Sequence, residues 1–180
     1  LNLNLESFDS IVAFLEKVHG EKFERIIILI GSVTSRDYFE IQYEEIAEYY
    51  RTYLTNLNYL FTRLIPLLEV DGNILLMSSR AASNPSFDAH YSAVKAGLEG
   101  FVRSSARVLS ALQSAVTVSS GLILNSSMYQ GMEESVRQSH EERAQGKLLE
   151  LEEAGRLIWG LTPIKTIGYS GKTMRIGPDY

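Results

Sequence analysis

Three apolar runs, each followed by small or hydroxylated residues, constrain this 180-residue chain more than any other feature. The runs are RIIILI before Gly31, NILLM before Ser78 and Ser79, and AVTVS before Ser120 and Gly121. Continuous apolar, β-branched runs of this length are typical of parallel strands that are covered on both faces. Because amphipathic segments with helical spacing separate them, the pattern predicts an α/β domain with a parallel sheet and right-handed crossovers.

The ends of these strands indicate where a ligand would bind. In open parallel sheets, ligands bind beyond the carboxyl ends of the strands. Gly31, Ser79 and Gly121 are all expected at that position. The sequence therefore predicts one domain over residues 1–180, with a single rim on which three strand ends converge.

A tyrosine and a lysine four residues apart, Tyr91 and Lys95 in YSAVKAG, follow the second run. Residues four apart share a helix face, so the Lys95 ammonium is expected to favour the ionised Tyr91 phenol and lower its pKa. A serine hydroxyl at the end of the preceding strand would hold a carbonyl oxygen beside that phenol. The spacing alone is more often an ordinary pair on a solvated helix face, but the order of strand, serines, loop and helix favours a proton-transfer site.

In the order and spacing of these motifs, the chain resembles the short-chain dehydrogenase/reductase family over most of its length. The resemblance implies a Rossmann-like doubly wound parallel sheet, NAD or NADP as cofactor, and a small carbonyl or alcohol as substrate. Ser79 matches the family's serine, with Ser78 as the alternative. Tyr91 matches the catalytic acid/base, and Lys95 the residue that lowers the tyrosine pKa and holds the nicotinamide ribose.

The same resemblance implies a set of cofactor contacts. The family's Asn-Asn-Ala-Gly turn is altered here to Leu-Ile-Gly-Ser, which ends in Gly31 and Ser32. Ile123 takes the place of the residue that meets the nicotinamide amide through its backbone, and Asn4 that of the aspartate at the adenine ring. The implied cofactor-binding residues are Asn4, Leu5, Gly31, Ser32, Tyr91, Lys95, Gly121 and Ile123.

The family's first strand, glycine-rich turn and helix have no counterpart, because the chain contains neither G-x-x-x-G-x-G nor G-x-G-x-x-G. We therefore expect roughly the first third of such a domain, with its N-terminal strands, to be missing. RIIILI would then lie at an open sheet edge, which an upstream segment, a partner chain or a rearranged Leu1–Leu5 segment should cover.

The long helix expected from about Gln42 to Leu68 carries a second departure. The family has an asparagine there that extends the proton relay. Counting back from Pro66 without a gap puts Tyr53 at that position, whereas Asn56 would substitute only if the register shifts. Asn56 as a plain polar residue on a helix is the other interpretation.

Composition excludes several other classes of function. A formal net charge of -5 with scattered lysines and arginines gives no electrostatic reason to bind nucleic acid. The chain has no cysteine, and its three histidines show no ligand spacing, so no metal site is expected. Because no apolar run approaches the length needed to cross a bilayer, we expect no membrane association and a cytoplasmic location.

Two segments are expected to contact a substrate or a partner. Residues 125–147 are polar, with weak periodicity, and match the family's substrate lid, although a solvated helix is an equal alternative. Met128, Tyr129 and Met132 would then touch the substrate. A tyrosine-rich helix suits a half-polar interface, so a homo-oligomer is expected. Its tyrosines are Tyr43, Tyr49, Tyr50, Tyr53 and Tyr59.

Three functional hypotheses follow. The first is an NAD(P)-dependent oxidoreductase that interconverts a carbonyl and a secondary alcohol through Ser79, Tyr91 and Lys95. The second is a degenerate, non-catalytic binding or scaffold module that keeps the fold but binds no dinucleotide. The third is an epimerase or dehydratase that uses the same tyrosine and lysine, which the sequence does not separate from a reductase.

Overall fold

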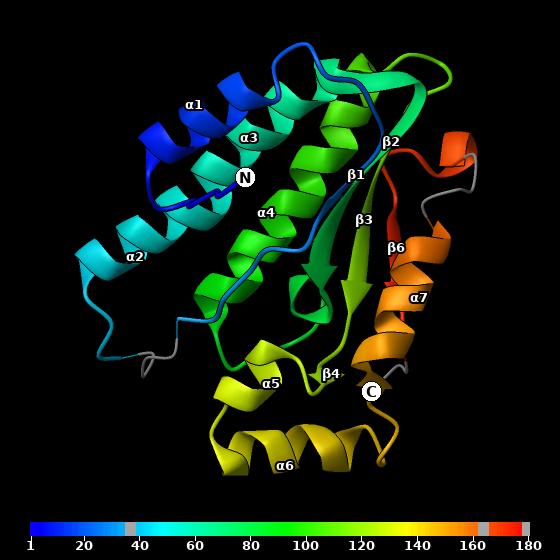
Figure 1. Cartoon of the computed structure of the whole chain (residues 1–180). Coiled ribbons are helices and arrows are strands. Elements are labelled where there is room, and N and C mark those ends of the chain that lie inside the picture. Colours follow the sequence, from blue (N-terminus) through cyan, green and yellow to red (C-terminus); the bar gives the residue numbers. More distant parts are fainter. Residues whose placement is uncertain (35–38, 162–165, 178–180) are drawn as a thin grey trace.

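The computed structural model describes residues 1–34, 39–161 and 166–177 (Figure 1). The main sheet is parallel, with the strand order β1-β2-β3-β6, and a second, two-stranded sheet pairs β4 with β5. The strands are β1 (Phe23–Ile28), β2 (Leu68–Ser79), β3 (Ser114–Ser120), β4 (Ile123–Leu124), β5 (Leu149–Glu150) and β6 (Thr173–Ile176). Residues 178–180, at the end of the predicted domain, lie outside the described ranges.

Helices alternate with the strands along the described ranges. The α-helices are α1 (Phe8–Lys17), α2 (Tyr43–Tyr50), α3 (Leu57–Leu64), α4 (Ala89–Ser105), α5 (Ser127–Gly131), α6 (Glu134–Arg143) and α7 (Leu151–Leu161). A π-helical segment (Arg51–Asn56) joins α2 to α3, and short 3₁₀ segments lie at Ile65–Leu67, Arg80–Ala82, Ala106–Val108 and Thr166–Tyr169. The expected helix over about 42–68 is thus one helical run with a wider turn in its middle.

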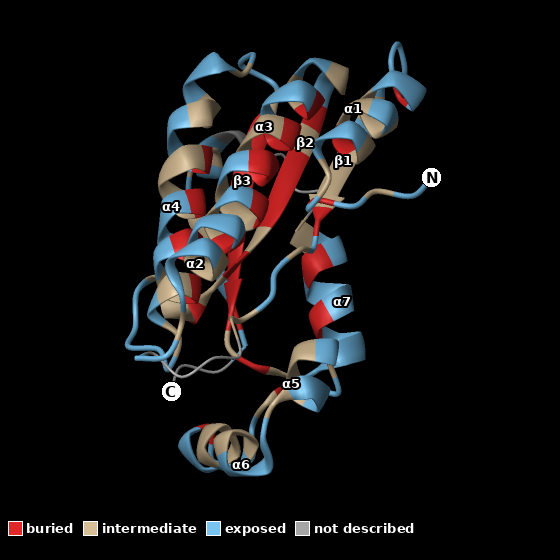
Figure 2. Ribbon diagram, turned by 90° about the vertical axis from the view of Figure 1, so that its left-hand side faces the viewer, coloured by how far each residue is buried: buried red, intermediate tan, exposed pale blue. Residues whose placement is uncertain are grey.

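Helices cover both faces of the main sheet (Figures 1 and 2). Ile74 and Leu76 of β2 pack in one core with residues of α1, α3 and α4. Leu75 of β2 packs on the opposite face, in a core that also holds Val118 and residues of α7. Successive strand residues point to opposite faces, so one apolar run fills both cores. This two-sided burial confirms the predicted doubly wound parallel α/β fold.

β1 lies at the edge of the sheet, as expected for RIIILI. Every residue of β3 is buried, whereas most of β1 is only partly buried and Leu29 just beyond it is 60% exposed. No other strand of the described chain pairs with the outer edge of β1. The Leu1–Leu5 segment does not do so either, because Leu5 is buried in the helical core and its carbonyl accepts a hydrogen bond from Asn56.

β2 starts before the apolar run NILLM that predicts it. The strand begins at Leu68 and runs through Asp71 and Gly72, two residue types that are typical of turns. The pairing with β1 shifts register there, between Phe23 and Arg25. A Cβ on Gly72 would lie 2.9 Å from the Phe23 carbonyl oxygen, so the close approach of the two backbones requires glycine.

Candidate active site at the carboxyl ends of the strands

Ser79, Tyr91 and Lys95 come together at the end of β2 and the first turns of α4. Ser79 is the last residue of β2, and α4 begins ten residues later. A hydrogen bond joins the side chains of Ser79 and Tyr91. The Ser92 hydroxyl donates to the Ala81 carbonyl at 2.5 Å, which fixes the first turn of α4 against the strand end. The structure therefore places the serine beside the phenol, as the sequence predicted.

Ser78 faces a different environment from Ser79. Its hydroxyl is buried and donates to Glu99 Oε1 of α4 at 2.6 Å. Consecutive residues of a strand point to opposite faces, so the two serines cannot both face Tyr91. Of the two candidates, Ser79 is the one that the structure puts next to the phenol.

The Tyr91 pKa does not follow the sequence-based expectation. Burial raises it, the hydrogen bond with Ser79 partly opposes that rise, and the Asp88 carboxylate adds to it. The expectation that Lys95 would set a lowered Tyr91 pKa is therefore wrong for this structure. With Tyr91 only 8% exposed, the loss of solvation outweighs the favourable interactions of the phenolate.

Lys95 is buried, and its ammonium contacts the backbone of two strands. Its Nζ donates to the Ile30 carbonyl at 3.1 Å and to the Met77 carbonyl at 2.9 Å, so it bridges the ends of β1 and β2. Nζ also lies 5.6 Å from the centroid of the Tyr91 ring. The side chain is 3% exposed, and burial lowers the Lys95 pKa to about 8. Lys95 thus supports the strand ends as well as facing the tyrosine ring.

Gly31 and Ser32 form the turn that follows β1, and both are exposed. A Cβ on Gly31 would lie 2.8 Å from Lys95 Nζ, so glycine leaves the space that the buried ammonium occupies. The Ser32 carbonyl accepts a hydrogen bond from the Tyr49 hydroxyl. Burial, followed by the Asp88 charge, raises the Tyr49 pKa strongly, so this phenol remains a donor.

The end of β3 supplies the other part of the predicted rim. Gly121 follows β3 and is partly buried. Ile123 begins β4, where it pairs with Leu149 in the short second sheet. Its backbone is therefore engaged in pairing at the position where the resemblance implies a contact to the nicotinamide.

Asn4 and Leu5 lie at the start of the chain, beside α1 and α3. The Asn4 side chain accepts from the Glu6 amide at 3.0 Å, which is a local turn before α1. Asn56 is buried and donates to the Leu5 carbonyl at 2.7 Å. Within the described residues, neither Asn56 nor Tyr53 is hydrogen-bonded to Lys95. Asn56 instead ties the helical run to the first residues of the chain, and the relay role of either residue remains a prediction.

The predicted lid, residues 125–147, forms α5 and α6, which lie beyond the carboxyl ends of β2 and β3 (Figure 1). The Tyr129 hydroxyl of α5 donates to Glu141 of α6 at 2.5 Å. Phe87, in the loop before α4, lies 5.8 Å from the His140 ring and 5.2 Å from the Arg143 guanidinium. The segment is thus tied to the loop that precedes Tyr91.

Sequence reasoning missed three residues that shape this site: Tyr49, Phe87 and Asp88. Asp88 is the N-cap of α4 and accepts from the Tyr91 amide at 2.8 Å. An aspartate directly before a helical segment is a recognisable N-cap signal, so this contact could have been predicted. The Tyr49 and Phe87 contacts join distant segments, and no local pattern indicates them.

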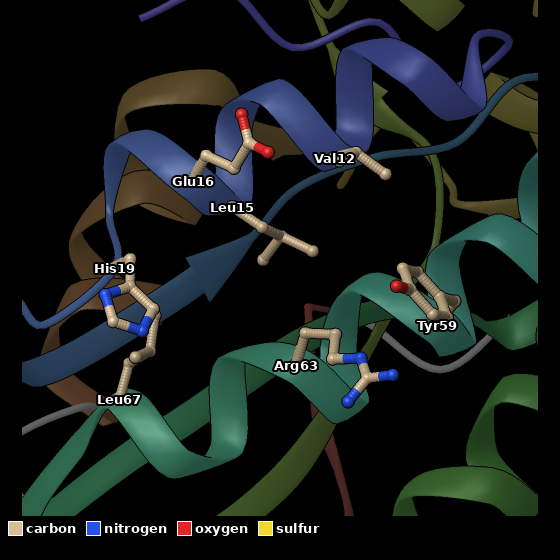
Figure 3. A pocket seen from close by; sticks show the side chains of 7 residues that line it. All are labelled: Val12, Leu15, Glu16, His19, Tyr59, Arg63 and Leu67. Carbon is tan, nitrogen blue, oxygen red and sulfur yellow. The ribbon is translucent and has the colours of Figure 1, made fainter.

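A shallow groove of about 400 Å³ lies between α1 and α3 (Figure 3). Its lining includes Leu15, Glu16 and His19 of α1 and Tyr59 and Arg63 of α3. These residues come just before β1 and β2 in the chain, so the groove lies toward the amino ends of the strands (Figure 1). It is separate from the rim that carries Tyr91.

The described ranges contain neither a candidate metal centre nor a candidate membrane-spanning helix. No group of three or more histidine, aspartate or glutamate side chains there is arranged to hold a metal ion. No helix in those ranges combines the length and apolar character needed to cross a bilayer. The candidate catalytic side chains are therefore those at the end of β2 and the start of α4.

Comparison with known proteins adds family information to this geometry. A protein-family model described as enoyl-(acyl carrier protein) reductase matches residues 2–176. No curated protein sequence matches the chain.

Solved structures share the fold at low sequence identity. A short chain dehydrogenase family protein from Francisella tularensis subsp. tularensis SCHU S4 has a TM-score of 0.84 and 18% identity, over 98% of this chain and 78% of that one. A small-chain dehydrogenase in complex with NADPH has a TM-score of 0.79 and 18% identity, over 97% and 80%. The angucycline C-6 ketoreductase LanV with bound NADP has a TM-score of 0.83 and 15% identity, over 96% and 71%.

Proposed function

The chain belongs to the short-chain dehydrogenase/reductase family, and from this premise we propose that it is an NAD(P)-dependent oxidoreductase that interconverts a carbonyl and a secondary alcohol. The observation that carries the proposal is the hydrogen bond between Ser79 and Tyr91 at the carboxyl end of β2, with Lys95 one helical turn away. Two of the solved relatives, described as complexes with NADPH and NADP, support the choice of cofactor.

The residues of the rim fit a dinucleotide in one specific respect. Two backbone carbonyls use two of the three hydrogens on the Lys95 ammonium, and within the described part of the chain no third acceptor is bonded to it. One N–H is therefore left for a ribose hydroxyl. Gly31 and Ser32 present an exposed turn beside it. These residues would hold the nicotinamide ribose.

The proposed chemistry assigns one task to each side chain. The nicotinamide, when bound, supplies the hydride to the carbonyl carbon or accepts it from the alcohol carbon. Ser79 donates a hydrogen bond to the substrate oxygen, and Tyr91 transfers its proton to that oxygen as the negative charge develops. Because burial raises the Tyr91 pKa, the phenol carries its proton at neutral pH, which suits it to act as the acid in carbonyl reduction. Lys95 holds a positive charge near the tyrosine ring.

A second candidate function is a non-catalytic binding or scaffold module of the same family. Two observations favour it: Tyr91 is almost fully buried, and the Lys95 ammonium is bonded to strand-end carbonyls. In such a module both residues would serve the fold alone. The two candidates differ in whether the protein binds a nicotinamide dinucleotide at all.

The experiment compares wild type with Tyr91→Phe, using NADH and NADPH fluorescence for binding and a panel of small ketones and aldehydes for turnover. Removing the phenolic proton should lower kcat by about 10²- to 10⁴-fold and leave the dinucleotide Kd nearly unchanged. Tyr169→Phe is the matched control, because Tyr169 is a half-exposed tyrosine in the 3₁₀ segment Thr166–Tyr169 that no part of the proposal uses. Undiminished turnover in Tyr91→Phe would end the catalytic assignment, and absence of dinucleotide binding in wild type would favour the scaffold module.

The proposal also covers the oligomeric state of the protein, its location in the cell and the role of residues 125–147. We propose a cytoplasmic homo-oligomer that uses the tyrosine-bearing surface of α2 and α3, where Tyr43 is exposed while Tyr49 belongs to the core. Light scattering after size-exclusion chromatography measures the assembly state directly. We also propose that residues 125–147 close over the substrate, with Met128, Tyr129 and Met132 in contact with it.

A further inference from the structure

Asp88 uses both carboxylate oxygens, and each bonds a different segment. Oδ1 accepts from the Tyr91 amide at 2.8 Å, which caps the N-terminus of α4. Oδ2 accepts from the Thr34 amide at 2.6 Å and from the Thr34 hydroxyl at 2.9 Å. Thr34 lies 54 residues earlier in the chain, in the turn that follows β1. One side chain thus connects the helix that carries Tyr91 to the end of a neighbouring strand.

This turn, residues 30–34, is held at three points along its backbone. Lys95 donates to the Ile30 carbonyl, Tyr49 donates to the Ser32 carbonyl, and Asp88 accepts from Thr34. Lys95 and Asp88 both belong to α4 or its cap, so the turn takes its position mainly from that helix. The turn contains no asparagine side chain that could hydrogen-bond its own backbone. The three external contacts do so instead.

Capping alone does not explain an aspartate at position 88. Asparagine, serine or threonine caps a helix about equally well, since one oxygen suffices. The carboxylate charge also raises the pKa of Tyr49, Tyr50 and Tyr91, which a neutral cap would not do. A carboxylate offers two acceptors and no donor, and Thr34 presents two donors to the second oxygen. An aspartate at position 88 can therefore accept both hydrogen bonds from Thr34 while it also caps α4.

We propose that Asp88 is a positioning residue that fixes the turn after β1 to the helix carrying Tyr91, and so sets the shape of the nicotinamide side of the cofactor site. The effect on the cofactor depends on the proposed function, whereas the contact between Asp88 and Thr34 does not. Asp88 touches neither reacting group, and it acts through Thr34 and the backbone of residues 31–33.

The test is Asp88→Asn, which separates the two contacts. The asparagine Oδ1 still accepts from one amide, so the cap can persist, but Nδ2 then faces the donors of the other segment. We expect hydrogen exchange at the Thr34 amide to be about tenfold faster and the Kd for NADPH or NADH to rise about tenfold, with kcat at saturating cofactor changed less. Thr34→Val is the graded comparison, because it loses only the hydroxyl bond and should show a smaller rise in Kd.

The two readouts distinguish the possible outcomes. Faster exchange at Thr34 without any dinucleotide binding in wild type would support the tether and reject the proposed function. Unchanged exchange and unchanged Kd in Asp88→Asn would overturn the proposal and reduce Asp88 to a helix cap. Should Asp88→Asn not fold, Asp88→Ser keeps a capping oxygen and must show the same two changes for the proposal to stand.

Discussion

The two sides of the rim are held in different ways. On the side of β1 and α4, the turn over residues 30–34 is bonded through its backbone to Lys95, Tyr49 and Asp88, and the lysine is buried. On the lid side, α6 has no buried residue, and its contacts to Phe87 and Tyr129 join side-chain groups near the surface. The proposed proton-transfer residues therefore share a preorganised frame, whereas the proposed substrate side can change with little cost to the fold.

The largest effect that we expect from this difference is a pH dependence of stability. Burial lowers the Lys95 pKa from its ordinary value of 10.5 to about 8 in the folded chain, so the unfolded chain binds more protons between these two values. The free energy of unfolding should therefore rise as pH increases from about 8 toward 10.5, by about 3 kcal/mol in total. Urea unfolding followed by circular dichroism between pH 7.5 and 9.5 measures most of this rise before tyrosine ionisation opposes it.

Lys95→Met sharpens this measurement. The variant has no ammonium to bury, so its free energy of unfolding should lose the rise with pH. Lys17→Met, at an exposed position on α1, should keep the rise. A wild-type free energy of unfolding that does not change over this pH range would show that Lys95 is not buried as a charged ammonium.

The next effect concerns the space that glycine leaves for this lysine. In Gly31→Ala the new methyl group would lie 2.8 Å from Nζ, so Lys95 must move away from the Ile30 and Met77 carbonyls. We expect a loss of about 1–2 kcal/mol in the free energy of unfolding, together with weaker dinucleotide binding. Differential scanning calorimetry and fluorescence titration measure the two.

Gly100→Ala is the control for Gly31→Ala. Gly100 lies inside α4, and a Cβ there would have no neighbour within 4 Å in the described residues. Alanine is the better helix former, so this variant should be more stable by about 0.5–1 kcal/mol. A Gly31→Ala protein as stable as wild type would show that Lys95 has room to move and that the turn is less tightly held than its contacts indicate.

The parts of this site that could be predicted from the sequence are the local ones. The ends of the apolar runs located Ser79 and Gly31, and the four-residue spacing placed Tyr91 and Lys95 on one face of α4. The direction of the Tyr91 pKa could not be predicted, because burial depends on how α4 packs on the sheet. The contacts of Asp88 with Thr34 and of Asn56 with Leu5 join residues more than fifty positions apart, and no periodicity encodes them.

The smallest effect should come from the lid side, with Phe87→Ala. Phe87 is 60% exposed and its ring contacts His140 and Arg143, so we expect a change of less than about 0.5 kcal/mol in the free energy of unfolding. Burial and Arg143 lower the His140 pKa, and loss of the covering ring should move that pKa back toward its ordinary value, which the NMR titration of His140 measures. The KM for a carbonyl substrate should rise a few-fold while the dinucleotide Kd stays constant, because this side of the rim is proposed to contact the substrate alone.

Leu112→Ala, at a residue that is 52% exposed and lies just before β3, should change neither KM nor the titration. A loss of stability in Phe87→Ala as large as that of Gly31→Ala would remove the distinction between the two sides, since the lid would then support the fold as strongly as the frame around Lys95 does.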